Sequence, residues 1–500
     1  MNFVNALKSE SHKGYTENGA IVYDSTLDSV YDLFVKGGSM RQASESDIKK
    51  LFADAYIEDP TMALRCLCYL RDIRGGLGER HTFRTILTWL VANHPKEAEM
   101  LIPFIPEFGR WDDLYTLDST GVEKAMYKFM YDQFKLDMQS KTPSLLGKWL
   151  KSTNTSSINS CALGRKTCEA FDLNERTYRK ALSTLRERIK VVERLMSQGR
   201  WNEIEFDKIP SGAGFRYRNA FARNDVLKER YKDFVEDDTK HFHADTLYPY
   251  QMVCEALKNA YSTGITRDSI NKYWTDLKNY FDERDFNALV VCDTSGSMTC
   301  GRDVRPIDVA ISLALYAADK CKGPFRNHFI SFSSRPQLIE TKGKDFVAKC
   351  EYIESRNLCE NTNIEATFDL ILNTAIANHM RQSDLPERLI IISDMQFDAA
   401  TGHYSYPVVN RTGEIRWRDT LMETIQHKWK AAGYNMPHLV FWNVNGSYEN
   451  SIPMLDENLT TYVSGASPTI FEMVASNKTG RDLMIDKLNS ERYSKIHSVE

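Results

Sequence analysis

The stretch VVCDTSGSM, residues 290–298, starts as an apolar run and then carries an aspartate and two serines placed around a glycine. The apolar run predicts a strand buried on both faces, because it lacks the alternation of polar and apolar residues that marks a half-exposed strand. Its polar end brings one carboxylate and two hydroxyls to the same place. Three such groups are too few for a binding site, so a site here needs residues from other segments.

Residues 286–500 alternate between short apolar runs and helical patterns. Four runs rich in β-branched residues predict strands: FNALVVCD (286–293), RNHFISFS (326–333), ERLIIISD (387–394) and PHLVFWNV (437–444). Apolar residues three and four positions apart predict helices between these strands, at 306–321, 364–378 and 419–433. This alternation predicts a C-terminal α/β domain with a parallel, doubly wound, Rossmann-like sheet.

Polar groups follow two of these strands and precede one helix. Asp293 ends the first strand and is followed by Ser295 and Ser297, whereas Asp394 ends the run ERLIIISD. A polar turn containing Thr362 precedes the helix at 364–378. In an open α/β sheet the functional crevice lies beyond the carboxyl ends of the strands, so we expect these groups to converge there. Their oxygen atoms, without sulfur or imidazole, predict a site for Mg²⁺ or Mn²⁺, although serine and aspartate after a strand also serve as simple helix caps.

This pattern resembles the metal-ion-dependent adhesion site of von Willebrand factor A domains, over roughly residues 286–480. The resemblance implies that Ser295, Ser297 and Thr362 bind the metal directly. It also implies that Asp293 and Asp394 bind the metal directly or through water, and that an Asp or Glu of a protein partner fills an open coordination position. The sequence departs from many relatives at residue 361, where asparagine replaces glycine. No residue near the ligands in sequence is suited to act as a general base, so we expect binding and no catalysis.

Residues 1–285 carry helical periodicity and no clear strand. Representative segments are 46–57, 60–73, 123–138, 177–196 and 249–261, in which apolar residues recur at three and four positions. Many helices of about 12–20 residues joined by short loops predict a stacked helical array. No strict repeat period is visible. The sequence thus predicts a multidomain protein, with an all-α helical-repeat domain at 1–285 and the α/β domain at 286–500.

The composition indicates the compartment of the protein and the charge of its partners. No apolar run approaches the roughly 20 residues that cross a bilayer, and no basic-then-apolar segment stands at the N-terminus. Ten cysteines without a C-x-x-C pair predict reduced thiols in a cytoplasmic protein. The net charge of −4 gives no global argument for nucleic acid, but residues 141–230 hold 19 Lys and Arg against 10 Asp and Glu. This local excess suits an anionic partner, although such faces also serve solubility alone.

Several segments of the helical part resemble the Ro/TROVE group, and more closely a set of uncharacterised Ro-related proteins. These segments are YLRDIRGGLGERHTFR (69–84), PEFGRWDDL (106–114), LLGKWLKSTNTSS (145–157), RTYRKALSTLRERIKVVE (176–193) and WNEIEFDKIPSGAGFRYRNAF (201–221). The resemblance implies a HEAT-like array that closes into a ring, binds single-stranded or structured small RNA, and belongs to a monomeric, non-enzymatic protein.

Basic residues of this region form the predicted RNA-binding set. They are Lys148, Arg165, Lys166, Arg179, Lys180, Arg186, Lys190, Arg216 and Arg218. Arg179, Arg186 and Lys190 are separated by seven and four positions, which predicts one helix face with charge for phosphates. The segment FRYRNAFAR alternates aromatic residues with arginines, as base stacking combined with phosphate contact requires.

Each of these motifs also has a plainer interpretation. Tyr217 and Phe221 are four residues apart and fit the core stripe of one helix. The glycines of RGGLGER could cradle a phosphate, but a loop between two helices needs glycine as well. His241 and His243 could ligate a metal, yet a surface pair is the better prediction without a third ligand nearby. The segment GRWDD is better suited to anchor a loop between helices, through Trp111 and Arg110, than to bind RNA.

Two other functions remain open on the sequence alone. One is a metal-dependent interaction scaffold or structural component, for example of a phage virion, that does not bind RNA; the acidic net charge favours it mildly. The other is a metal-dependent hydrolase, which would require a general base outside the segments described above.

Overall fold

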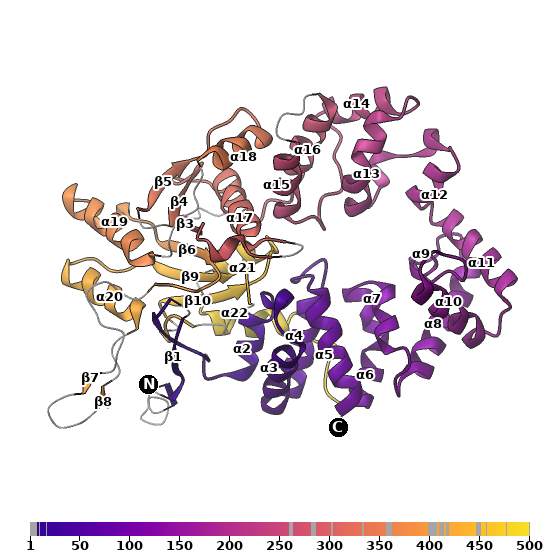
Figure 1. Cartoon of the computed structure of the whole chain (residues 1–500), viewed down its shortest axis with the longest axis horizontal. Helices are drawn as coiled ribbons and strands as arrows, with labels where there is room; N and C mark the ends of the chain where they lie inside the picture. The colour runs from indigo at the N-terminus through magenta and orange to yellow at the C-terminus, as the bar shows by residue number, and fades with distance from the viewer. Residues whose placement is uncertain are drawn as a thin grey trace. The chain divides into compact units, whose positions relative to one another are not determined.

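The computed structural model describes most of the chain (Figure 1). The chain forms two compact units. The described residues are 8–9, 11–16, 18–259, 264–281, 287–301, 304–332, 335–356, 363–398, 420–446, 452–456, 458–476 and 478–499, together with the backbone of 408–409 and 415–416. Unit 1 comprises Met1–Cys66, Leu247–Ser262 and Leu277–Ser494, and unit 2 comprises Leu67–Thr246, Thr263–Asp276 and Lys495–Glu500.

A six-stranded mixed sheet forms the centre of unit 1. Its strands lie in the order β10-β9-β6-β3-β4-β5. Their bounds are β3 Ala288–Asp293, β4 His328–Phe332, β5 Gln337–Glu340, β6 Arg388–Ser393, β9 His438–Asn443 and β10 Thr460–Ser464. All neighbours pair in parallel except β4 and β5, which are antiparallel. The four predicted strands are confirmed as β3, β4, β6 and β9, whereas β5 and β10 were not predicted.

Helices cover this sheet. They are α17 Pro306–Lys320, α18 Phe346–Ser355, α19 Ile364–Ala377, α20 Leu421–Ala431, α21 Ile470–Val474 and α22 Gly480–Leu488, with 3-10 turns η6 Ser297–Thr299 and η7 Gln382–Asp384. Every residue of β3 and of β6 is buried, as their continuous apolar sequences require. A further two-stranded ribbon pairs β7 Val408–Val409 with β8 Ile415–Arg416.

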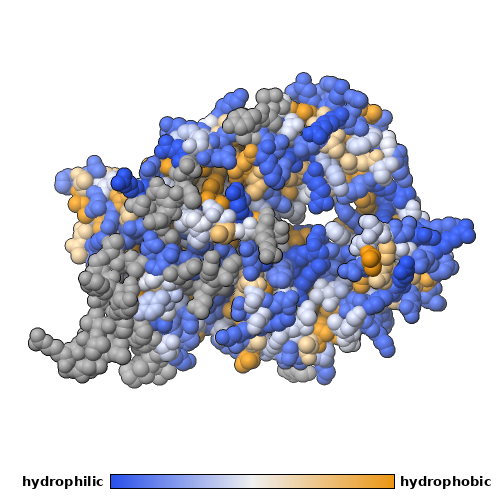
Figure 2. All heavy atoms as spheres, in the orientation of Figure 1, coloured by the Kyte–Doolittle hydropathy of each residue, from blue (hydrophilic) through white to orange (hydrophobic). Residues whose placement is uncertain are grey.

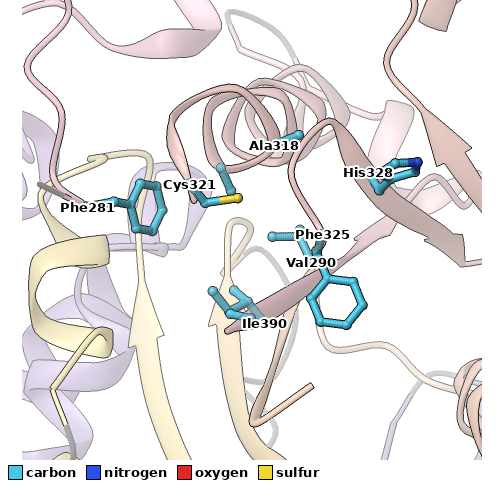
Figure 3. A pocket seen from close by; sticks show the side chains of 9 residues that line it. Phe281, Val290, Ala318, Cys321, Phe325, His328 and Ile390 are labelled. Atoms are coloured by element: carbon cyan, nitrogen blue, oxygen red, sulfur yellow. The ribbon is translucent and has the colours of Figure 1, made fainter. Parts of the chain in front are cut away.

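A small apolar cavity lies between α17 and the sheet, as Figure 3 shows. Val290 of β3 and its register partner Ile390 of β6 face Ala318 and Cys321 of the helix region. Its lining is almost wholly apolar and includes the first residue of β3. The cavity is therefore part of the core packing and is separate from the carboxyl ends of the strands, where we expect the metal site.

N-terminal elements also belong to unit 1. They are β1 Lys13–Tyr15, β2 Ile21–Tyr23, α2 Ser29–Lys36, η1 Met40–Gln42, α3 Glu45–Glu58 and, from later in the chain, α15 Pro249–Lys258. Helix α15 packs on α17 and α18, and α2 packs on β10. The compact units thus differ from a division at 285/286. The physical reason is that the sheet unit needs apolar cover, and Val30, Leu33 and Phe34 of α2 are buried in providing it.

Unit 2 is entirely helical in its described residues, which agrees with the helical periodicity of this part of the sequence. Its longer helices are α5 Arg80–Asn93, α8 Glu123–Gln139, α10 Ile158–Ala170, α11 Glu175–Arg188, α13 Ser211–Arg223, α14 Lys228–Glu236 and α16 Ile265–Thr275. The shorter ones are α6 Pro95–Leu101, α7 Ile105–Phe108, α9 Leu146–Trp149, α12 Val192–Ser197 and the 3-10 turns η2 Ile102–Phe104, η3 Trp111–Leu117, η4 Trp201–Glu203 and η5 Phe206–Lys208. Helix α4, Pro60–Arg71, begins in unit 1 and ends in unit 2.

One predicted helix, 177–196, is two helices. Helix α11 ends at Arg188 and α12 begins at Val192. Between them Lys190 adopts φ +52°, a left-handed conformation that interrupts the helical hydrogen bonds. The continuous periodicity of the sequence did not reveal this break.

The exteriors carry the polarity expected from the composition. On the face shown in Figure 2 hydrophilic residues predominate, with hydrophobic ones scattered among them. In the described part of the chain no helix combines the length and apolarity needed to span a membrane. The nine cysteines described there are all free thiols, and burial raises the pKa of Cys254 and of Cys321 to about 11.

Candidate functional site

The first component of the candidate metal site is the turn after β3. Asp293 is fully buried, and its Oδ1 accepts a hydrogen bond from the backbone N–H of Ser295 at 2.9 Å. The hydroxyl oxygens of Ser295 and Ser297 lie 3.1 Å apart. The tight turn around Gly296 therefore brings both hydroxyls to one point beside the aspartate, as the sequence predicted.

The second component is the turn after β6. Asp394 is buried, and its Oδ1 accepts from the backbone N–H of Gln396 at 3.2 Å. Met395 between them has φ +64°, a conformation that costs a residue with a side chain about 1–2 kcal/mol. The Ser393 hydroxyl accepts from the Met395 N–H at 3.0 Å and so holds this strained turn in place. Strain of this kind clusters at functional sites.

The sheet brings the two turns together. Strands β3 and β6 are parallel neighbours with Cys292 opposite Ile392, so the residues after them emerge at the same edge. The Ser393 hydroxyl donates to Asp293 Oδ2 at 2.5 Å, which links the turns directly. From β3 the chain first adds β4 and β5 on one side and then returns to β6, β9 and β10 on the other. The site therefore lies at the point where the strand order reverses, the usual position of a ligand in such sheets.

Electrostatics distinguish this pair of carboxylates from ordinary buried groups. Burial, and after it the negative charge of Asp394, raises the pKa of Asp293 to about 7, although hydrogen bonds from Ser393 and Ser295 act in the opposite direction. Two carboxylates this close repel when both are ionised. Their oxygens and the two serine hydroxyls are hard ligands, so the residues present fit a small divalent cation.

Thr362, the remaining predicted ligand, lies outside the described residues. The chain resumes at Asn363, whose side chain accepts from the Ala366 N–H at 2.9 Å and caps α19. In the described part of the chain, no group of three or more His, Cys, Asp or Glu residues is arranged to hold a metal. The candidate site differs from such groups because half of its described ligands are hydroxyls.

An N-terminal segment that the sequence gave no reason to place here contacts the second turn. The Thr16 hydroxyl donates to the Phe397 carbonyl at 2.6 Å, and the Asn18 amide donates to the Gln396 carbonyl at 2.7 Å. Gly19 forms a β-bridge with Asp398. These contacts join residues about 380 positions apart, and no local pattern signals them.

The predicted RNA-binding residues all lie in unit 2 and differ in how exposed their side chains are. Six of them are exposed: Arg165, Lys166, Arg179, Lys180, Lys190 and Arg216. Lys166 is tied to Asp118 by an ion pair of 2.7 Å, and Arg165 lies 3.5 Å from Glu175. Lys148 is half-buried, with its ammonium 5.7 Å from the centre of the Trp149 ring.

Arg186 turns inward, so the prediction that it shares an outer face with Arg179 and Lys190 is wrong. Its guanidinium donates to the carbonyls of Gly147 and Leu150, at 3.0 and 2.9 Å, and to the Ser152 hydroxyl at 3.1 Å. These bonds fix α9 and the segment after it against α11. The spacing rule found the correct helix but could not show which of its arginines would be taken up by neighbouring carbonyls.

Arg218 is buried as well, which corrects the interpretation of FRYRNAFAR as an alternating RNA-binding surface. Its guanidinium lies 4.3 Å from the centre of the Phe215 ring. Phe221 is 1% exposed and packs against Phe206 and Tyr231, so the plainer interpretation of a core stripe is confirmed for it. Arginine beside aromatic residues looks alike in a core and on an RNA-binding surface.

Two further motifs also have structural roles. In RGGLGER the N–H groups of Leu77, Gly78 and Glu79 donate to carbonyls at the end of α4, which occupies the donors that a phosphate would need. A side chain at Gly76 would meet the Tyr69 carbonyl at 2.0 Å, so the glycine is required there. His241 is exposed and pairs with Asp276 at 2.7 Å, as expected for a surface position.

GRWDD is the anchor that the sequence predicted, and the structure shows how it works. Asp113 is fully buried and binds Arg71 through Nε and Nη2 at 2.9 and 2.6 Å. Arg84 reaches the other oxygen of Asp113, with its Nε at 2.8 Å. Trp111 stacks on Phe129 with 5.6 Å between ring centres. Aspartate and aromatic residues of one short turn thus join three helices.

Fold and site together define a chain with an α/β unit that bears a polar site at its switch point, and with a helical unit rich in surface cations. The family model described as "Domain of unknown function (DUF2828)" matches residues 16–144 and 149–284, more than half of the chain, and the protein belongs to this family. A second model, "Domain of unknown function (DUF7788)", matches residues 287–495.

Individual relatives extend over most of the chain. An uncharacterized protein of Acanthamoeba polyphaga mimivirus is 26% identical over 504 aligned residues, which cover 92% of this chain and 84% of the relative. The crystal structure of the Deinococcus radiodurans RO (RSR) protein matches 90% of this chain and 99% of its own, with 11% identity and a TM-score of 0.45. At that TM-score the likeness carries no argument about function.

Proposed function

We propose that this protein is a non-enzymatic, Ro-like RNA-binding protein whose α/β unit carries a Mg²⁺- or Mn²⁺-dependent adhesion site for an acidic partner. One observation carries the metal part of the proposal. Asp293 and Asp394, with Ser295 and Ser297, converge at the switch point of the sheet with two turns linked by a hydrogen bond. In sequence these residues resemble the adhesion-site motif of von Willebrand factor A domains.

The residues of the chain have distinct tasks in this proposal. Ser295 and Ser297 present hydroxyl oxygens 3.1 Å apart, and Ser393 orients the Asp293 carboxylate. When bound, the cation supplies an open coordination position that suits a carboxylate of a partner. No step of bond cleavage is proposed, because a hydrolase needs a positioned general base.

The metal part is tested by calorimetric titration of the full chain with Mg²⁺ and with Mn²⁺. Asp293→Asn, Asp394→Asn and Thr362→Ala should each lose metal binding. Asp293 is the last residue of β3 and Asp394 directly follows β6, so their variants should keep the circular dichroism of the wild type. Asp384→Asn is the matched control, since this exposed aspartate of the same unit is not a predicted ligand; it pairs with Arg381 and accepts from the Ser383 hydroxyl at 3.5 Å. Unchanged isotherms in Asp293→Asn and Asp394→Asn would refute the ligand assignment.

The RNA part is supported by the sequence segments that resemble Ro/TROVE proteins and by the exposed cations of unit 2. Arg179 and Lys180 lie exposed on α11, and Arg216 lies exposed on α13. Exposed arginines and lysines on a helical surface are the groups that neutralise phosphates. Arg186 and Arg218 are left out of this set because their guanidinium groups are engaged inside the unit.

RNA binding is tested with a labelled single-stranded RNA at several salt concentrations. The affinity should fall steeply with salt, and the double reversal Arg179→Glu with Lys180→Glu should weaken it. An affinity indifferent to both would leave the interaction scaffold as the better function. An absorbance ratio at 260 to 280 nm well above that of pure protein, for material purified from native cells, would favour RNA.

A further inference from the structure

A second group of cations in unit 2 contains none of the predicted RNA-binding residues, although one of those, Lys148, is close to it in sequence. It consists of Arg80, Arg84, Arg110 and Lys151, which we call the basic cluster. Arg80 and Arg84 lie in the first turns of α5, Arg110 precedes η3, and Lys151 follows α9. Three segments separated by up to 71 positions therefore contribute to it, which is why no run of sequence signals it.

Two aspartates hold the arginines in place without neutralising the cluster. Arg80 Nη2 binds Asp112 at 2.5 Å, and Arg84 Nη2 binds Asp113 at 2.7 Å. Arg110 Nε lies 3.5 Å from Asp112. Because Asp113 also binds the buried Arg71, five cations surround two carboxylates and three positive charges remain.

The side chains of the cluster remain partly accessible. Those of Arg80, Arg84 and Arg110 are 40%, 32% and 33% exposed. Lys151 forms no ion pair with the described carboxylates, and its ammonium lies 5.5 Å from the centre of the Tyr115 ring. Burial, and after it the charges of Arg84, Arg80 and Arg110, lowers the pKa of Lys151, although Asp112 acts in the opposite direction.

Two of these cations lie close to aromatic rings. The Arg110 guanidinium lies 4.7 Å from the centre of the Trp149 ring. A guanidinium stacked on a ring uses its face for that contact and keeps its in-plane N–H groups for an oxygen ligand. Arg186, through its bonds to Gly147, Leu150 and Ser152, fixes the segment that carries Trp149 and Lys151. The cluster is thus preorganised.

We propose that the basic cluster binds consecutive phosphates of an RNA strand. One phosphodiester carries a single negative charge, so three uncompensated positive charges suit several adjacent phosphates better than an isolated one. In the segment STNTSS at 152–157, which directly follows Lys151, Ser152 binds Arg186 and Thr153 is buried, but Asn154 and Ser156 are exposed and offer an amide and a hydroxyl that suit phosphate and ribose oxygens. This inference rests on the proposed RNA binding and names where on unit 2 it occurs.

The test measures the affinity of the full chain for a fluorescently labelled 12-nucleotide oligouridylate between 50 and 200 mM salt. Lys151→Met should weaken binding about tenfold at the lowest salt and reduce the slope of log affinity against log salt by about 0.7, the value for one phosphate contact on a single strand. Lys151→Arg should restore both. Arg110→Ala, which leaves Asp112 and Asp113 paired with other arginines, should act like Lys151→Met.

Lys208→Met is the matched control. It removes the same charge from an exposed lysine of unit 2, but one that pairs with Glu205, so affinity and slope should stay at wild-type values. Circular dichroism of each variant separates loss of binding from loss of folding.

The outcomes distinguish the levels of the proposal. If the wild type binds the oligouridylate and both cluster variants bind it equally well, the assignment of RNA binding to the basic cluster is refuted, and the proposed RNA binding itself is not. If the wild type binds none, the proposed function itself fails. If a polyglutamate peptide binds as tightly as RNA and Lys151→Met abolishes that binding, the partner is an acidic protein and the RNA assignment is overturned.

Discussion

Asp113 in the helical unit and Asp293 in the α/β unit are both fully buried aspartates, yet their surroundings have opposite effects. Burial alone would raise the pKa of Asp113, but Arg71 and Arg84 bring it below the usual 3.8. Burial and Asp394 raise the pKa of Asp293 to about 7. The charge around Asp113 is in positive excess, whereas the charge around Asp293 is negative.

This difference shows what a buried carboxylate does in each unit. Fixed arginines surround Asp113, so this carboxylate serves the structure, and in the inference above the surplus positive charge binds an anion. At Asp293 a second carboxylate occupies the neighbouring position, and in the proposed function a small cation would relieve their repulsion. Burial alone does not distinguish the two aspartates, whereas the sign of the neighbouring charge does.

Removing the carboxylate of Asp113 should have the largest effect on stability. Asp113→Asn leaves Arg71 buried without its charge partner, and loss of one member of such a pair costs about 3–5 kcal/mol. Denaturant unfolding followed by hydrogen exchange in α5 and η3 measures the loss. Asp225→Asn, on an almost fully exposed carboxylate of the same unit, should change stability by less than about 0.5 kcal/mol. Equal effects of the two variants would contradict the role given to Asp113.

Adding a cation should stabilise the unit that contains Asp293. Mg²⁺ at 100 times its dissociation constant should raise the unfolding free energy of unit 1 by about 2.7 kcal/mol, because it binds only the folded site. Asp394→Asn should abolish that rise. It should also stabilise the metal-free protein, since it removes the repulsion at Asp293. Thermal unfolding with EDTA and with Mg²⁺ measures the stability of the metal-free protein and the rise caused by the cation. If Asp394→Asn is still stabilised by Mg²⁺, the assignment of the cation to the Asp293–Asp394 pair is refuted.

Arg186 and Arg179 lie on one helix but have different roles: Arg186 is bound by neighbouring groups, whereas Arg179 is exposed. Arg186→Ala removes three hydrogen bonds to groups of the α9 region and should cost about 2 kcal/mol. Arg179→Ala should leave stability within about 0.5 kcal/mol and affect only the affinity for RNA. Denaturation midpoints and RNA titrations of both variants give the comparison. A large loss of stability in Arg179→Ala would mean that it too is engaged in packing.

Acid should remove the contribution of His438 to the stability of unit 1 at a higher pH than it removes the contribution of Asp113 to the stability of unit 2. Burial, and after it the charge of Arg388, lowers the pKa of His438 below its usual 6.5, so the folded state holds this proton less well than the unfolded chain. The stability that comes from neutral His438 is present above pH 6.5 and is lost as the pH falls through its folded pKa. The stability from ionised Asp113 is present above its unfolded pKa near 3.8 and is lost only below that.

Asp293 acts in the opposite direction over this range, because its pKa of about 7 lies above that of the unfolded chain and its protonation favours the folded unit. The contribution of His438 is therefore measured as a difference between the wild type and His438→Gln in hydrogen exchange of β9 between pH 7 and pH 4. As the pH falls, β9 should keep more protection in His438→Gln than in the wild type, and α5 should not differ between them. This is the smallest of the expected effects. The same pH dependence of β9 in both proteins would contradict the assignment.

Local pattern was sufficient where burial on both faces or a helical period dictates the residues. The runs that became β3, β4, β6 and β9 were predictable because a strand between two helix layers must be apolar throughout. The polar residues at the ends of β3 and β6 were predictable for the same reason, since they interrupt such runs. Strand β5 was not, because it lies at the sheet edge and is mostly exposed.

Pattern was insufficient where distant segments meet. The contacts of Thr16 and Asn18 with the turn after β6, and the basic cluster drawn from three segments, depend on how the chain returns to itself. The helix break at Lys190 depends on a single backbone conformation inside a continuous helical period. None of these leaves a repeated spacing in the sequence.

The sequence by itself determined the classes of the two parts, the strands that end in Asp293 and Asp394, and the oxygen chemistry of the candidate metal site. It could do so because hydrophobic periodicity and strand ends are local properties. Only the tertiary structure decided which charges face each other: that Arg186 and Arg218 point inward, and that Arg110 and Lys151 gather beside Asp112. Charge interactions act through space, and their sign and strength depend on neighbours that the chain supplies from far away in sequence.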